Sequence, residues 1–390
     1  MAVQEDVNQT SSLGWIYVVV SDTRSPGPRE PVPSWLPGSA VAVYGSLLTV
    51  VGILVNATVL GSSLAAGKGS TVPAVRRLLT VNLSVIQLAA AVLVVPAGVV
   101  TEALGNWTFG GHACRAWLFV QILLIASTTW SLVGLDVDCI LRLAAPRRAY
   151  AVLTDRRRRT AALVIIISSW MVAALAALPI GLAVGARQSS ADGDNAPVLE
   201  DVCAVSLSRR DVVAQSLTAF LLPGVLGLIG SVAIVAMKVS KMIAVDRHDR
   251  GPTAVAWVGA ACVLMWSPFF ALYTLLPFCG DELCIDPATW TLFAWIGRST
   301  LVVATSAWFI DAAVRSDVRQ FAHLVRRRCC CCVPQGNVTS SALSVCDGVE
   351  NVADDSSGLI SVAKYQIHRP VQQQQPQQHN DSPNVYLSPA

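Results

Sequence analysis

The feature that most limits what this chain can fold into is a series of long apolar stretches without charge. A helix that crosses the hydrocarbon core of a membrane needs about 20 apolar residues, because that core is about 30 Å thick. Six such stretches contain no Asp, Glu, Lys or Arg, and a seventh contains only Arg298. In lipid the backbone must satisfy its own polar groups, so all seven are predicted to be helices. The predicted spans are Val41–Leu64, Leu78–Val100, Ala116–Leu135, Thr160–Val184, Val212–Met237, Pro252–Cys279 and Pro287–Ile310.

The low charge of the chain supports a membrane protein and argues against other classes. Only 14% of the 390 residues are Asp, Glu, Lys or Arg, against roughly 25% in soluble domains. This composition argues against a soluble enzyme, a disordered protein and a nucleic-acid-binding domain. The sequence has no Gly-rich phosphate loop, paired-carboxylate motif or metal-ligand spacing, so we expect no enzymatic activity, cofactor or metal. The predicted fold is an all-α membrane protein, a seven-transmembrane helix bundle.

The distribution of Lys and Arg orients the predicted bundle. Two sets of connecting segments alternate along the chain, one with 19 Lys and Arg residues and one with 6. Cytoplasmic loops carry the excess of basic residues, which places the amino terminus outside the cell and the carboxyl terminus inside. The richer segments are 65–77, 136–159, 238–251 and 311–332, and the poorer are 1–40, 101–115, 185–211 and 280–286.

The chain divides into three regions. Residues 1–40 are predicted to be a disordered extracellular tail without a cleavable signal peptide. Residues 41–328 are the membrane domain, and residues 329–390 are predicted to be a palmitoylation run followed by a disordered cytoplasmic tail. Asn8 and Asn106 stand in external Asn-x-Thr sequons and are the candidate glycosylation sites.

The position of each cysteine predicts its chemistry, because disulfides form on the external side of the membrane. Four cysteines are external or at the outer boundary, and their positions suggest the pairs Cys114–Cys203 and Cys279–Cys284. A run of four follows three arginines just inside the membrane, which favours S-palmitoylation. A zinc site is the competing interpretation, but four adjacent cysteines fit a tetrahedral ion poorly. The run is Cys329, Cys330, Cys331 and Cys332.

Local motifs occur in a fixed order along the spans. They are Gly52-Ile53-Leu54-Val55-Asn56 in span one, Asn82-Leu83 and Pro96 in span two, Trp107-Thr108-Phe109-Gly110 before span three, Trp170 and Pro179 in span four, Pro223 in span five and Trp266-Ser267-Pro268-Phe269-Phe270 in span six. With the external cysteines Cys114 and Cys203, this order resembles the rhodopsin-like (class A) G-protein-coupled receptors over roughly residues 40–332. The resemblance implies a short interfacial helix after span seven, here Arg315–Arg328.

The resemblance also identifies positions where this chain lacks the residues that switch the family's receptors. Cys139, 25 residues after Cys114, stands in place of the arginine of the family's Asp-Arg-Tyr triplet. Asp138 is expected to pair instead with Arg142, because residues four apart share a helix face. Gln87 replaces the aspartate that binds sodium in the family, and a neutral amide supplies no charge for a buried cation. We therefore expect no sodium site.

Span seven and span five also lack residues that act as switches in the family's receptors. Ala307-Trp308-Phe309-Ile310-Asp311 stands in place of the family's Asn-Pro-x-x-Tyr, which removes both the proline kink and the tyrosine. Asp311 is expected in the cytosolic headgroup zone near Arg315, and Ser231 replaces a tyrosine of span five. Asn56 is retained. These differences put conventional signalling in doubt but leave the fold intact.

The resemblance places any ligand pocket in the external half of the bundle. Gln121 occupies the position at which amine receptors carry an aspartate, and its neutral side chain argues against a biogenic-amine ligand. Trp266 lies two residues before a proline, which kinks the helix. Its ring could form the floor of the pocket or simply pack the bundle, and the sequence favours neither interpretation. Phe269, Phe270 and Tyr273 would form an aromatic wall.

Arg298 is the charged residue inside a predicted span. Such residues are costly in lipid and are by default candidates for function, so Arg298 could meet a carboxylate or phosphate on a ligand. The competing interpretation is that it snorkels outward or bonds to backbone carbonyls.

Taken together, the residues predict a plasma-membrane receptor for an unidentified extracellular ligand, with heterotrimeric G protein or arrestin and membrane lipid as partners. Its coupling would be weak or constitutive. The first alternative is a non-signalling relative that captures ligand or pairs with another receptor, and the second is a small transporter, although no internal repeat supports it.

Overall fold

The computed structural model describes residues 16–20, 38–66, 72–144, 155–183, 203–242, 250–278 and 287–330. Within them, seven helical segments are long and apolar enough to cross a membrane. Each coincides with one of the predicted spans, which confirms the seven-helix fold class. The segments are Gly38–Ala65, Ala74–Leu104, Gly110–Ala144, Arg159–Leu182, Arg209–Ser240, Gly251–Leu275 and Ala288–Ile310.

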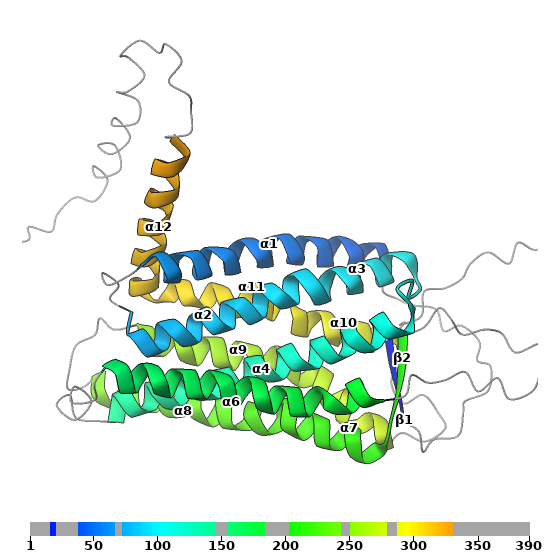
Figure 1. Cartoon of the computed structure of the whole chain (residues 1–390). Helices are drawn as coiled ribbons and strands as arrows, with labels where there is room; N and C mark the ends of the chain where they lie inside the picture. Colours follow the sequence, from blue (N-terminus) through cyan, green and yellow to red (C-terminus); the bar gives the residue numbers. More distant parts are fainter. Residues whose placement is uncertain are drawn as a thin grey trace, which may run out of the picture. The chain divides into compact units, whose positions relative to one another are not determined.

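Figure 1 shows these helices side by side in a bundle. Helix α4 packs against α2, α6, α8 and α9 and is therefore the central helix. Large apolar side chains such as Leu54, Ile167 and Val232 are more than half exposed on the outside of the bundle, as expected for surfaces that face lipid. The helices are α1 (Gly38–Ala65), α2 (Ala74–Ala89), α3 (Val95–Leu104), α4 (Gly110–Ala144), α6 (Asp155–Leu182), α7 (Arg209–Ser216), α8 (Leu222–Met242), α9 (Gly251–Leu275), α10 (Pro287–Arg298), α11 (Thr300–Ser306) and α12 (Ala312–Cys330).

Several helices extend past the uncharged stretches that predicted them. The largest difference is at span three, predicted as Ala116–Leu135 and observed as α4, Gly110–Ala144. The physical reason is that an apolar stretch measures the hydrocarbon thickness, whereas the backbone hydrogen bonds of a helix continue into charged sequence.

Two spans contain short π-helical turns next to proline. The turn η2 (Ala90–Val94) precedes Pro96, and η3 (Leu217–Leu221) precedes Pro223. Proline lacks the backbone N–H of a regular turn and its ring clashes with the carbonyl four residues earlier, so the wider turn relieves the crowding. The turn η2 supplies Ala90 and Val94 to the wall of the cavity described below, and η3 buries Ala219 and Phe220.

Span seven is interrupted between residues 298 and 300, although no proline lies near this point. Helix α10 ends at Arg298 and α11 begins at Thr300, and the span closes with a 3-10 turn, η5 (Ala307–Ile310). Asp311 then adopts an extended backbone, and Ala313 donates its N–H to the Asp311 carboxylate at 3.0 Å. Helix α12 leaves the bundle at this point (Figure 1) and packs on α1, which confirms the predicted interfacial helix.

The opposite end of the bundle carries the outer disulfide, Cys114–Cys203, as predicted. Cys203 begins strand β2 (Cys203–Leu207), which pairs in parallel with β1 (Ile16–Val20) (Figure 1). The sequence analysis did not expect this two-stranded sheet, because Ile16–Val20 is a short apolar run within a region predicted to be a disordered tail. The helix α1 also begins inside that region, at Gly38. Span six ends in the 3-10 turn η4 (Leu276–Phe278).

Candidate functional site

A cavity of about 40 Å³ lies inside the bundle below the outer disulfide. Gln121, two helical turns after Cys114 on α4, is part of its wall. The lining is mostly apolar, with a few polar groups that converge from different helices, which is the usual character of a small-molecule site. The lining residues are Gln87, Ala90, Val94, Val95, Gln121, Leu124, Ile125, Thr128, Cys262, Trp266, Arg298, Thr300 and Leu301.

Arg298 points into the bundle and is only 5% exposed. Its Nη2 donates a hydrogen bond to Oε1 of Gln121 at 3.3 Å. The guanidinium carbon lies 4.6 Å from the ring centroid of Trp295 and 5.7 Å from that of Trp117, within cation–π distance. Gly98 of α3 makes room for it, because a Cβ at this position would lie 3.1 Å from Nη1.

The charge of Arg298 has no close counter-ion. Among the described residues, no carboxylate lies within 4.0 Å of it, and its Nε has no hydrogen-bond partner. Glu102 of α3 interacts with it electrostatically from farther away. Arg298 therefore does not snorkel outward, and no hydrogen bond to a backbone carbonyl is found in the described part of the chain.

Trp266 forms part of the cavity wall and is also tightly packed. Its Nε1 donates to Oγ1 of Thr300 at 3.3 Å, which joins α9 to α11. A Cβ at Gly297 would lie 2.4 Å from the indole ring, so α10 approaches this side chain closely. The two interpretations of Trp266, cavity wall and helix packing, are thus compatible, since the same ring lines the cavity and packs against α10.

The three aromatic residues that follow Trp266 do not line this cavity. Phe269 and Phe270 pack instead in an aromatic cluster, with ring centroids 4.9 Å from Trp290 and 4.4 Å from Phe220 respectively. The hydroxyl of Tyr273 donates to Oε1 of Gln215 on α7. The predicted aromatic wall is a helix-packing element, because these residues of α9 contact η3, α7 and α10.

A second, smaller cavity of about 10 Å³ shares Gln87 with the first and continues toward the other end of the bundle. Its volume suits about one water molecule. Trp308, which replaces the family's proline, forms part of the wall. Asn56 joins α1 to α11: its Nδ2 donates to the carbonyls of Gly52 and Leu301, and its Oδ1 accepts from Thr305 at 2.9 Å.

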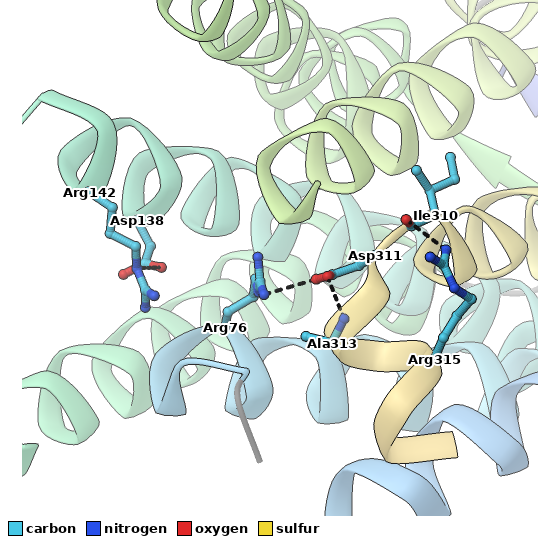
Figure 2. A network of polar contacts seen from close by, with 7 residues as sticks. All are labelled: Arg76, Asp138, Arg142, Ile310, Asp311, Ala313 and Arg315. Atoms are coloured by element: carbon cyan, nitrogen blue, oxygen red, sulfur yellow. Dashed lines mark hydrogen bonds and ion pairs between the residues drawn. The ribbon is translucent and has the colours of Figure 1, made fainter. Parts of the chain in front are cut away.

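The end of the bundle next to α12 contains a buried ion pair that the sequence analysis did not predict. Nη2 of Arg76, in the first turn of α2, lies 2.9 Å from Oδ2 of Asp311 (Figure 2). The side chains are only 10% and 4% exposed. Asp311 was expected near Arg315, and its ion pair is with Arg76. Arg315 donates instead to the carbonyls of Phe309 and Ile310.

Arg76 also contacts the first residue of α9. A Cβ at Gly251 would lie 1.7 Å from Nη1 of Arg76, so a larger residue at this point would displace the guanidinium. The guanidinium thus lies where α2, α9 and the turn before α12 meet. Its charge also acts on Cys139, the residue that replaces the family's arginine.

The predicted pair on α4 is present. Nε of Arg142 lies 2.8 Å from Oδ2 of Asp138, one turn apart on the helix (Figure 2). Cys139, between them in the sequence, is a buried free cysteine and does not take part in this ion pair. The acid of the triplet is therefore satisfied locally, without the arginine that the family has.

A further acid on α4 was missed. Asp136 is 2% exposed, and neither of its carboxylate oxygens has a hydrogen-bond partner in the described part of the chain. A Cβ at Gly230 of α8 would lie 2.8 Å from this carboxylate, and the hydroxyl of Ser231 is likewise buried without a partner. The uncharged stretch that predicted span three ends at Leu135, one residue too early to include it. A search of the apolar face past that stretch would have found it.

Other predicted sites are only partly covered by the structure. Asn106 is half-buried beside the turn before α4, and Cys329 and Cys330 end α12. The remaining predicted residues lie outside the described residues: Asn8, Cys279, Cys284, Cys331 and Cys332. Glycosylation, palmitoylation and the second disulfide stay predictions.

Comparison with known proteins gives one family. The family described as 7 transmembrane receptor (rhodopsin family) matches residues 56–303. The D(1) dopamine receptor of Carassius auratus is 24% identical over 293 residues, which are 63% of this chain and 79% of the receptor. The D(5)-like dopamine receptor of Takifugu rubripes is 25% identical over 310 residues, which are 69% of this chain and 64% of the receptor.

A shorter match has higher identity. Human neurotensin receptor type 2 is 32% identical over 123 residues, which are 30% of this chain and 29% of that receptor. All three relatives are receptors rather than enzymes, in agreement with the prediction that this chain has no enzymatic activity. The chain is thus similar to proteins whose names give different ligands.

Proposed function

This chain belongs to the rhodopsin family of seven-transmembrane receptors, and from this premise we propose that it receives an extracellular ligand in the cavity at Gln121 and Arg298. It is a multi-pass protein of the plasma membrane. The observation that carries the proposal is the polar site inside a mostly apolar cavity, two helical turns below the outer disulfide. The basic segments at the other end support an external amino terminus.

The proposed ligand is not a biogenic amine. Two relatives are named dopamine receptors, and the amine of dopamine is protonated at neutral pH, as that of lysine is. In this chain Gln121 offers no negative charge, and the buried guanidinium of Arg298 lies in the same cavity wall. An ammonium group would meet a like charge in a site of low dielectric, which is unfavourable. The charge of the cavity thus supports a neutral or anionic ligand.

The proposed output is a G protein or arrestin, with weak or constitutive coupling. Cys139 cannot form the charged contacts of the family's arginine, and the more deeply buried of the two ion pairs found in the described residues joins Arg76 to Asp311. The inactive arrangement then depends on α2 and the turn before α12 rather than on α4. A rearrangement that separates these elements must break a buried ion pair, whose cost opposes activation.

The test measures G-protein activation and arrestin recruitment in cells that express the full chain, without ligand and with a panel of neutral, acidic and amine compounds. We expect responses to acids or neutral compounds and none to amines. The Cys139→Arg variant restores the family's residue and should increase the ligand-dependent response at equal surface expression. An amine response that survives Arg298→Gln would contradict the proposed ligand class.

The competing function is a receptor that binds ligand or pairs with another receptor but does not signal. The observation in its favour is Cys139, because the residue that normally meets the G protein is missing. Ligand binding to the purified protein, with no G-protein or arrestin response for either the natural chain or the Cys139→Arg variant, would support this function.

A further inference from the structure

The cavity wall contains a positive charge whose partner is missing from the described part of the chain. Two arginines are buried in the described helices, Arg76 and Arg298. Arg76 has a carboxylate at 2.9 Å, whereas Arg298 has none within 4.0 Å among the described residues. A buried cation without a counter-ion is costly, since it has lost its hydration without a replacement. Of the two, Arg298 is therefore the cation for which a ligand would supply the missing counter-ion.

We infer that the cavity at Arg298 is a subsite for a ligand carboxylate attached to a compact apolar body; this inference rests on the proposed function. The guanidinium is held in place from several sides, by the hydrogen bond to Gln121 and by the faces of Trp295 and Trp117. These contacts use the ring faces and one N–H, and leave Nε without a hydrogen-bond partner. A planar, fixed guanidinium fits a carboxylate in a bidentate manner.

The charge balance favours a carboxylate over a phosphate. One arginine carries a single positive charge, which one carboxylate neutralises, whereas a phosphate brings close to two negative charges at neutral pH. The described lining contains no second cationic side chain. The other polar residues of the lining are neutral, namely Gln87, Gln121, Thr128 and Thr300. A phosphate would therefore remain partly uncompensated in this site.

The apolar part of the lining defines the rest of the ligand. Val94, Leu124, Ile125 and Leu301 surround the cavity beside the guanidinium, and its volume is about 40 Å³. Apolar surface removed from water on binding stabilises the complex by roughly 25 cal/mol per Å². The occupant is thus a small monocarboxylic acid, or the acidic end of a longer one.

Glu102 provides an internal competitor. It acts electrostatically on Arg298 from α3 but forms no ion pair with it within 4.0 Å. A carboxylate ligand must share the guanidinium with this residue. Removal of the Glu102 charge is therefore expected to strengthen ligand binding, whereas in a purely structural pair it would only destabilise the protein.

The test uses the purified full chain in lipid nanodiscs and measures Tm against the concentration of acetate and propionate, with acetamide and propanamide as neutral controls of the same shape. A ligand that binds the folded state raises Tm with concentration. We expect the two acids to raise Tm and the amides to have little effect. Because this comparison uses the natural chain, it does not depend on a variant that folds.

Variants then locate the effect. Arg298→Gln should lower the affinity for the acids by about tenfold to a hundredfold, the range of a charged hydrogen bond, and Glu102→Gln should raise it. Arg115→Gln, which removes an arginine from the outer end of the bundle, is the matched control and should leave the affinity unchanged. Equal Tm shifts for acids and amides, the absence of any shift, or unchanged affinity in Arg298→Gln would each overturn the inference.

The same compounds are applied to cells with G-protein and arrestin readouts. If the acids do not bind the purified protein but other compounds still activate the receptor, the carboxylate subsite is rejected and the receptor function is not. Acids that bind with the expected variant effects but evoke no response in cells support the subsite and reject the signalling function.

Discussion

Breaking the Arg76–Asp311 ion pair should cost more stability than breaking the other ion pair at the same end of the bundle. The structure supplies a nearly isosteric change, Asp311→Asn, which removes the charge. The side-chain oxygen of asparagine can still accept the hydrogen bond from Ala313 that begins α12. The partner change, Arg76→Gln, removes the cation. Either single change leaves one charge buried without a counter-ion.

The expected magnitude follows from burial and distance. The two charged groups are 2.9 Å apart and their side chains are 10% and 4% exposed. At an effective dielectric constant near 20, charges about 4 Å apart attract by about 4 kcal/mol, and removal of one partner of a buried pair costs about 3–5 kcal/mol. By the scaling of soluble domains of 150–250 residues, 3 kcal/mol corresponds to roughly 6–12 °C in Tm.

The assay is thermal unfolding of the purified chain in nanodiscs, for both single variants and for the double variant. The double variant should be no less stable than the worse single variant, because neither charge is then left alone. Asp138→Asn breaks the other pair, whose side chains are 20% and 11% exposed, and should cost only about 0.5 kcal/mol. Additive losses in the double variant, or equal losses in Asp138→Asn and Asp311→Asn, would refute the reasoning.

Three further changes test other contacts. Gly251→Ala places a Cβ 1.7 Å from the present position of Nη1 of Arg76, so Tm should fall and basal G-protein activation should rise; unchanged values of both would contradict the role of this contact. Cys203→Ser removes the disulfide to Cys114, and a loss of about 2–5 kcal/mol is expected, seen as a lower Tm that reducing agent no longer changes. Asn56→Ala removes three buried hydrogen bonds between and within α1 and α11; unfolding in nanodiscs should show a loss of about 2 kcal/mol or more, and a Tm within error of the natural chain would be evidence against it.

The sequence predicted the elements of the fold well because the relevant signals are local. A stretch of about 20 uncharged apolar residues has few options in lipid, so each span could be placed without reference to the others. The pair Asp138–Arg142 was also predictable, since both residues lie on one helix four positions apart. The strand Ile16–Val20 was missed because its partner strand is about 190 residues away, and the pairing leaves no local pattern.

The candidate site could be predicted only in part. Gln121, Trp266 and Arg298 were identified as pocket residues, and all three line the cavity. Phe269, Phe270 and Tyr273 were assigned to the same wall but are not among the residues that line it, because sequence spacing gives the relative angle of residues on one helix and not the rotation of that helix in the bundle. For the same reason, the sequence could not decide whether Arg298 points into the bundle or outward.

The amino-acid sequence by itself determined that this chain forms seven membrane helices and an outer disulfide, because apolar length and cysteine position are properties of single segments. The short helix after span seven was expected from the resemblance to the receptor family. Only the tertiary structure decided which charges are paired. Arg76 was counted among loop cations and is instead buried against Asp311, whereas Arg298 and Asp136 are buried without a close partner of opposite charge among the described residues. Such pairing depends on the packing of helices that are distant in the sequence, and the hydrocarbon thickness that places each helix sets no constraint on it.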